Sequence, residues 1–269
     1  MKNIFCKTVF GIFFLSTQLF AQAGMTVSPG KMYYKLAPGA TSTQKVSVSN
    51  PNKMELQVGV SLSDWNYDAY GNNIINEAGT LKTSCSDWVQ VMPGSYFTLQ
   101  PGEQKELNII LNVPAEANTT IPVRTAMLFF TQLNPGDSKN QDGSFLKVSV
   151  RMGVKIYHSF TQNEERGLEI LNFADKIDTQ KKDAGVLELE VQNTGKVWLE
   201  SKIKWELLNT QTGEKISLDD QESYSLPGDK RIVTRSLPAD LKKGRYNATA
   251  LVSYGNKDEL KIAELEFER

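Results

Sequence analysis

Apolar and polar residues alternate along most of the chain, as in a β-strand that has one buried face. Apolar residues alternate with others in 43–49, where Val46 and Val48 share one face, and in 56–62 and 107–113. A denser apolar run at 127–130 is typical of a central strand buried on both faces. No segment combines a helix start signal with helical periodicity, so the sequence predicts an all-β protein.

Turn residues separate the alternating runs at fairly regular intervals. Asn50-Pro51 and Pro101-Gly102 each follow such a run. Short strands at this spacing predict a β-sandwich. The remaining predicted strands lie at 88–91, 97–99, 186–191, 197–208, 232–236, 245–254 and 260–267.

Three polar segments interrupt the pattern. Residues 67–84 are rich in Asn and Gly, which indicates an insertion or an extra edge hairpin. Residues 134–144 contain Pro and Gly and predict a flexible loop. Residues 161–167, TQNEERG, predict a linker between domains. The chain is therefore predicted to form two tandem immunoglobulin-like β-sandwich domains, at 24–160 and 161–269.

The N-terminal residues have the three parts of a secretory signal. Lys2 and Lys7 are basic, an apolar stretch follows at 9–15, and residues 21–23 read Ala-Gln-Ala. The apolar stretch is shorter than the roughly 20 residues of a membrane-spanning helix. We expect residues 1–23 to be a cleaved signal peptide and the exported protein to have no membrane span.

Composition argues against several classes of function. The net charge of −1 lacks the basic bias of a nucleic-acid-binding protein. Without the signal, Cys85 is the remaining cysteine, which excludes a disulfide framework and a Cys/His metal site. The single histidine, His158, lies in a strand-like run without a nucleophile motif. We expect no enzyme, no metal and no cofactor.

The longest alternating run, 146–156, allows two interpretations. Either all its apolar residues face the sandwich core, as composition alone favours, or the run is an edge strand that could pair with another chain. The apolar residues of the run are Leu146, Val148, Val150, Met152, Val154 and Ile156.

Several motifs, in a fixed order, resemble the PapD-like periplasmic pilus (fimbrial) chaperones of the chaperone-usher pathway. They cover 27–158, and the second domain matches only as a similar sandwich. The motifs are VSPGKMYY, KVSVSNP, FTLQPGEQKELNI, RTAMLFF and FLKVSVRMGVKIYH. The resemblance implies a chaperone in the periplasm that binds pilus or related surface-fibre subunits, with an outer-membrane usher as a further candidate partner.

The resemblance also implies site residues. Members of the family donate an edge strand to the subunit, which here corresponds to Leu146, Val148 and Val150, with Met152 extending the row. They also bind the subunit's C-terminal carboxylate with two basic residues, to which Lys31 and Lys155 correspond. Lysine lacks the bidentate fork of arginine and makes a less directional contact.

Other functions stay open from the residues. A structural or adhesive cell-envelope module would cover the long strand and leave the two lysines apart. A carbohydrate-binding protein would use an aromatic platform. A free chaperone with an apolar edge strand could also self-associate. The platform would consist of Tyr33, Tyr34, Trp65, Tyr67 and Tyr70.

Overall fold

The computed structural model describes residues 24–135, 137–139, 145–160, 165–177, 185–255 and 259–269. The predicted signal peptide, 1–23, lies outside these ranges, as do residues 161–164 of the predicted linker. Among the described residues, no helix is both long and apolar enough to cross a membrane.

The first part of the chain forms β-strands and one short 3-10 helix, η1 (Ser86–Trp88). The strands are β1 (Thr26–Ser28), β2 (Lys31–Lys35), β3 (Thr41–Ser49), β4 (Leu56–Tyr67), β5 (Asn73–Asn76), β6 (Val89–Met92), β7 (Tyr96–Leu99), β8 (Gln104–Asn112), β9 (Val123–Gln132), β10 (Asp137–Lys139), β11 (Phe145–Lys147) and β12 (Arg151–Ser159). The second part is also all β. Its strands are β13 (Leu168–Ile177), β14 (Gly185–Asn193), β15 (Leu199–Asn209), β16 (Lys215–Ser225), β17 (Lys230–Ser236), β18 (Arg245–Tyr254) and β19 (Leu260–Glu268).

Strands β1–β12 form the first sandwich. One sheet has the order β1-β3-β8-β6, and the other has the order β2-β12-β9-β4-β5, with β7 also paired to β4. Alternate residues of both sheets fill one hydrophobic core, for example Val48 and Leu107 from one sheet and Leu128 and Ile156 from the other. Strand β9 is buried along most of its length, as its dense apolar run predicts.

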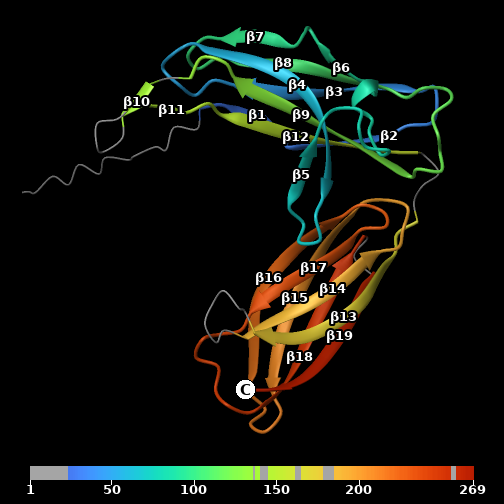
Figure 1. The fold of residues 1–269 in the computed structure, drawn as a ribbon, viewed down its shortest axis with the longest axis vertical. Coiled ribbons are helices and arrows are strands. Elements are labelled where there is room, and N and C mark those ends of the chain that lie inside the picture. Colours follow the sequence, from blue (N-terminus) through green and yellow to red (C-terminus); the bar gives the residue numbers. More distant parts are fainter. Residues whose placement is uncertain (1–23, 136, 140–144, 161–164, 178–184, 256–258) are drawn as a thin grey trace, which may run out of the picture.

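Strands β13–β19 form the second sandwich, from the sheets β13-β14-β17 and β16-β15-β18-β19. Its separate core surrounds Trp205 and includes Leu189, Leu207 and Val252. The strands of the two sandwiches run in different directions in Figure 1, and the sandwiches meet at an angle. This architecture confirms the predicted fold class, whereas the exact domain limits at 160 and 161 stay a prediction.

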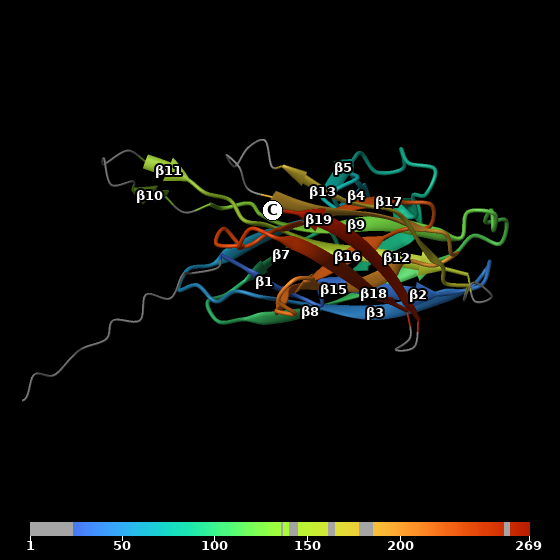
Figure 2. The ribbon, with the colours of Figure 1, turned by 90° about the horizontal axis from the view of Figure 1, so that it is seen from below.

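Some predicted elements differ from the structure. The insertion at 67–84 does contain an edge hairpin, because β5 pairs with the end of β4. The loop at 134–144 is not wholly irregular, because β10 pairs with β11. These two strands project from the end of the first sandwich that lies away from β2 (Figures 1 and 2). Strands β13 and β16 were not predicted, because their sequences alternate poorly.

The predicted long strand at 146–156 is wrong in one respect: it is divided between β11 and β12, and residues 148–150 belong to neither strand. Its apolar row is also divided in burial. Val154 and Ile156 lie in the first core, whereas Val148 is 53% exposed and Met152 36% exposed. The interpretation that the whole row faces the core is therefore wrong for these two residues.

His158 is a fully buried polar residue of the first sandwich. Its Nε2 lies 3.1 Å from the Leu36 carbonyl oxygen, which can only accept, so Nε2 carries the proton. Nδ1 has no hydrogen-bond partner among the described residues. Burial lowers the pKa of His158 because a charged imidazolium would lose its hydration there, and nearby Arg124 acts in the same direction.

This burial predicts acid sensitivity. The pKa of His158 is below its ordinary value of 6.5 in the folded state, so the unfolded chain binds more protons as the pH falls through that value. The contribution of His158 to stability is therefore complete above about pH 7 and decreases as the pH falls below that value. Urea unfolding should show a smaller loss over this range for His158→Gln, whose amide can still donate to Leu36. Equal pH dependence of both proteins would contradict the assignment.

Candidate functional site

The parallel pairing of β2 with β12 brings the two predicted anchor residues together. Lys31 is the register partner of Lys155, and Tyr33 is the partner of Tyr157. Neighbouring strands lie about 4.8 Å apart, and paired residues point to the same face. Because Ile156 faces the first core, Lys155 points to the opposite face, towards the second sandwich. The two lysines thus belong to one site.

Aromatic rings from both sandwiches line this face. The ring of Tyr33 stacks against those of Tyr157 and Trp198, with a centroid distance of 5.1 Å to each, and the latter two rings lie 5.3 Å apart, so the three rings contact one another. Trp198 comes directly before β15, so this stack crosses from the first sandwich to the second. A hydrophobic cluster continues it and includes Trp65 from β4 and Leu226 from the second sandwich.

Burial of three of its five residues rules out the aromatic platform suggested by the sequence. Tyr34, Trp65 and Tyr67 are 2%, 0% and 7% exposed. A sugar-binding platform needs exposed ring faces, and three of its five predicted members have none. Tyr34 belongs to the core of the first sandwich, where its hydroxyl donates to the Ile109 carbonyl at 2.8 Å.

The ammonium group of Lys155 is held by aromatic residues. Its Nζ lies 4.4 Å from the ring centroids of both Trp65 and Tyr67, and it donates to the Tyr67 hydroxyl at 2.9 Å. Burial, together with the charges of Lys31 and Arg231, lowers the pKa of Lys155 from 10.5 to about 8. Rings offset only part of the hydration that the ammonium loses, so this cation could gain from an anionic ligand.

Lys31 has a different environment. Its Nζ donates to Glu200 Oε1 at 3.0 Å and lies 3.9 Å from the ring centroid of Tyr224. The Tyr33 hydroxyl donates to the same oxygen at 2.5 Å. Partial burial opposes ionisation of Glu200, but the bonds from Tyr33 and Lys31 hold the pKa of its carboxyl below its usual value. Burial and the bond to Glu200 raise the pKa of Tyr33.

A cleft of about 300 Å³ adjoins this carboxylate. It is open to solvent and has both apolar and charged walls. A ligand could therefore reach the Glu200 side of the site without unfolding either sandwich. The cleft is lined by Tyr33, Arg166, Trp198, Leu199, Glu200 and Gly255.

The hairpin of β4 and β5 reaches from the first sandwich to the second (Figure 1). Asp68 shapes its tip: its carboxylate accepts bonds from the backbone N–H groups of Tyr70 and Asn72 at 2.9 and 2.8 Å. Gly71 follows with a φ of +86°, a conformation that glycine adopts without a Cβ clash. The Asp68 carbonyl accepts the N–H of Gly71 at 3.2 Å within the turn, and the carbonyl groups of Asp68 and Ala69 also accept bonds from outside the hairpin.

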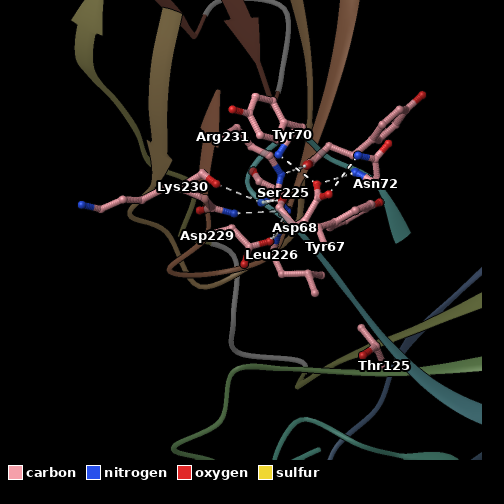
Figure 3. Close-up of polar contacts among 12 residues, drawn as sticks. Tyr67, Asp68, Tyr70, Asn72, Thr125, Ser225, Leu226, Asp229, Lys230 and Arg231 are labelled. Atoms are coloured by element: carbon pink, nitrogen blue, oxygen red, sulfur yellow. Dashed lines mark hydrogen bonds and ion pairs between the residues drawn. The ribbon is translucent and has the colours of Figure 1, made fainter. Parts of the chain in front are cut away.

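Arg231 of β17 binds this hairpin tip (Figure 3). Its side chain is 3% exposed, and its Nη1 donates to the Asp68 carbonyl at 2.9 Å. Its guanidinium lies 4.6 Å from the Tyr67 ring centroid and pairs with the carboxylate of Asp229. The next residue, Ile232, donates its N–H to the Ala69 carbonyl at 2.8 Å. These contacts fasten the second sandwich to the first beside the lysine pair.

The candidate donor residues lie at the start of β12 and in the residues before it. From Lys155 onward β12 pairs with β2, but in the described chain Arg151–Val154 are paired only with β9. Val148 and Met152 are exposed, and Val150 is half-buried. Leu146 lies in β11, and its side chain is outside the described residues.

Solved structures with the same fold were found by comparison. A chaperone–tip adhesion subunit pre-assembly complex, CsuC–CsuE, from the archaic chaperone-usher Csu pili of Acinetobacter baumannii matches at a TM-score of 0.50 and 12% identity, over 90% of this chain and 98% of that one. The YadV chaperone matches at a TM-score of 0.49 and 10% identity, over 91% and 100%. The E. coli chaperone DraB matches at 0.47 and 16%, over 90% and 98%. The first of these matches confirms the resemblance to pilus chaperones at the level of the fold.

Neither a protein-family model nor a curated protein matches the sequence. At 12% identity the structural likeness shows the fold alone. The roles of individual side chains therefore depend on the geometry described above.

The partners of the two lysines were not predicted from the sequence. A weak signal existed for the tyrosines, because Tyr33 and Tyr157 each follow a lysine by two positions and so share its face. No local signal existed for Glu200 or Arg231, whose contacts depend on how the two sandwiches are placed.

The pKa of Lys155 can be tested directly. We expect the Cε signal of Lys155 in NMR to titrate with a pKa of about 8. Lys31→Met removes a like charge and should raise this pKa, although not to 10.5, because burial is the larger cause. Lys45→Met removes an exposed lysine that is paired with Glu106 and serves as the control. A pKa of Lys155 that is equally affected by both substitutions would contradict the described site.

The contacts of Arg231 predict its contribution to stability. Arg231→Ala removes the cation from the carboxylate of Asp229 and one of the two hydrogen bonds that the Asp68 carbonyl accepts, and it should lower the free energy of unfolding by about 3 kcal/mol. Arg235→Ala is the matched control on the same strand, because its partner carboxylate, Asp219, is 94% exposed. Its cost should stay below about 1 kcal/mol in the same urea titration. Similar costs for both variants would show that Arg231 does not fasten the sandwiches.

Proposed function

We propose that this protein is a periplasmic chaperone that binds pilus, fimbrial or related surface-fibre subunits. The observation that carries the proposal is the in-register pair of Lys31 and Lys155 beside a half-paired strand. The pair offers two cations to one anionic group, and the strand offers backbone hydrogen bonds to an extended partner. Together they suit a β-strand that ends in a free carboxylate.

The strand contributes through β-augmentation. Arg151–Val154 have one edge without a described strand, so their backbone groups can pair with an added strand. Val148 and Met152 continue the row of Val154 and Ile156 beyond the core, and they are available to a groove on the partner. Burying each such side chain would contribute on the order of 1.5–3 kcal/mol. Leu146 and Val150 complete the proposed donor row.

The lysine pair fixes the end of the partner. Charge-assisted hydrogen bonds to a carboxylate are about twice as strong as neutral ones, and two of them define where the chain ends. Such an anchor sets the register of the partner strand along β12, because a shift by one residue would turn its side chains to the other face. The proposed mechanism needs no nucleotide or cofactor and includes no catalytic step.

The fold supports the choice of partner. The chaperone of the Acinetobacter baumannii complex has this fold and is described with a tip adhesion subunit. We extend that class of partner to this chain, with export to the periplasm through residues 1–23 and an outer-membrane usher as a candidate second partner. Self-association through the free part of β12 would compete with binding of a subunit.

The proposal predicts the loss of partners from lysine variants. Tagged protein, recovered from the native periplasm, should retain small β-rich secreted proteins, which mass spectrometry identifies. Lys31→Ala/Lys155→Ala should lower this recovery at least about 10-fold, because two charge-assisted bonds are lost. Lys45→Ala/Lys105→Ala carries the same charge change elsewhere in the first sandwich and should retain the partners.

A second variant tests the strand separately. Val148→Asp/Met152→Asp changes exposed residues, so folding should be preserved while a charged pair replaces the donor row. Its recovery of partners should also fall. Equal recovery by wild type and both variants would refute the chaperone mechanism and favour the structural or adhesive module.

A further inference from the structure

A carboxylate of the protein itself already lies at the lysine pair. Glu200 is at the start of β15 in the second sandwich, and it reaches across to Lys31 and Tyr33 of the first. The side chains of Lys31 and Glu200 are 33% and 49% exposed, so solvent and solutes can reach the ion pair. The cleft described above opens beside it.

Glu200 forms an ion pair with Lys31 but not with Lys155. Lys155 bonds to the Tyr67 hydroxyl and faces the rings of Trp65 and Tyr67. In the described parts of the chain, no carboxylate lies within ion-pair distance of Lys155. The site therefore contains two neighbouring cations but an internal carboxylate that contacts only one of them.

We infer that Glu200 is an internal substitute for the ligand carboxylate, which an incoming carboxylate must displace from Lys31 in order to contact both lysines. This inference rests on the proposed function. The exchange is physically accessible because a half-exposed ion pair is weak and is screened by salt. A ligand that bridges both cations gains the contact to Lys155, which Glu200 does not make.

The exchange would make the cleft selective. A neutral chain end, such as a carboxamide, cannot replace the negative charge on Lys31, so Glu200 would remain in place. A carboxylate that reaches only Lys31 would merely exchange one ion pair for an equivalent one. A net gain requires contact with Lys155 or with the adjacent strand, and a chain end that lies along β12 provides both.

A purely structural role for Glu200 makes a different prediction. In that case the residue only joins the two sandwiches, and its replacement would weaken their contact without improving the binding of any anion. The effect of Glu200 on the affinity for a small carboxylate separates the two roles.

Acetate is a suitable probe because it carries the carboxylate without a peptide chain. The Cε and Nζ signals of Lys31 and Lys155 are followed by NMR in the full exported protein, with chloride used to match the ionic strength. Glu200→Gln keeps the size and the hydrogen-bond acceptor but removes the charge. Its affinity for acetate should rise about 2- to 5-fold, as expected when a half-exposed ion pair no longer competes. Acetamide should shift neither lysine in any variant.

Two further variants complete the design. Glu200→Asp withdraws the carboxylate by one methylene while keeping the charge, and it should also raise the affinity for acetate. Glu106→Gln removes a carboxylate from an exposed ion pair with Lys45 and should leave the affinity unchanged. If Glu200→Gln fails to fold, Glu200→Asp decides the question alone.

The outcomes distinguish the inference from the function on which it rests. If acetate shifts both lysines equally well in wild type, Glu200→Gln and Glu200→Asp, the anchor stands and the competition by Glu200 is refuted. A lower affinity in the Glu200 variants also refutes it. If acetate shifts neither lysine in any variant, the carboxylate anchor itself fails.

Discussion

The parallel, in-register pairing of β2 with β12 is the constraint on which the site depends. It places Lys31 beside Lys155 and Tyr33 beside Tyr157, so the two lysines and the two stacked tyrosine rings are neighbours on one face. The opposite face of the same strands contributes Ile156 to the first core. Because β2 covers only the last part of β12, Arg151–Val154 are paired, among the described strands, with β9 alone. One register thus positions both the cations and the available backbone.

A second constraint joins the two sandwiches. The hairpin of β4 and β5 offers two backbone carbonyl groups to β17, and Arg231 and Ile232 donate to them. This contact does not involve Lys31 or Glu200. The sandwiches can therefore remain joined while the ion pair between those two residues opens. A ligand site at a domain junction needs the contacts that join the domains to be distinct from those that the ligand displaces. Otherwise, binding would weaken the junction.

The strand pattern predicted most of the fold, and its failures have physical causes. Strand β16 contains consecutive polar residues on a sheet edge, where only one face needs apolar side chains, so alternation gave no signal. The break between β11 and β12 within 146–156 could not be predicted, because the alternation of apolar and polar residues continues beyond the end of the core. Lys31 and Lys155 followed from the family resemblance. Glu200 and Arg231 could not be predicted, because their contacts join distant segments of different sandwiches.

The proposed function requires a site that is stable without a ligand and still attracts one, and the different environments of Lys31 and Lys155 would meet this requirement. Lys31 has a carboxylate and needs no further partner for the fold to be stable. Lys155 has rings and a hydroxyl, which replace its hydration incompletely, and its pKa of about 8 reflects that deficit. A ligand carboxylate would stabilise the charged form of Lys155. Under the proposed function, the affinity of the site would therefore depend chiefly on Lys155, which has no carboxylate within ion-pair distance among the described residues.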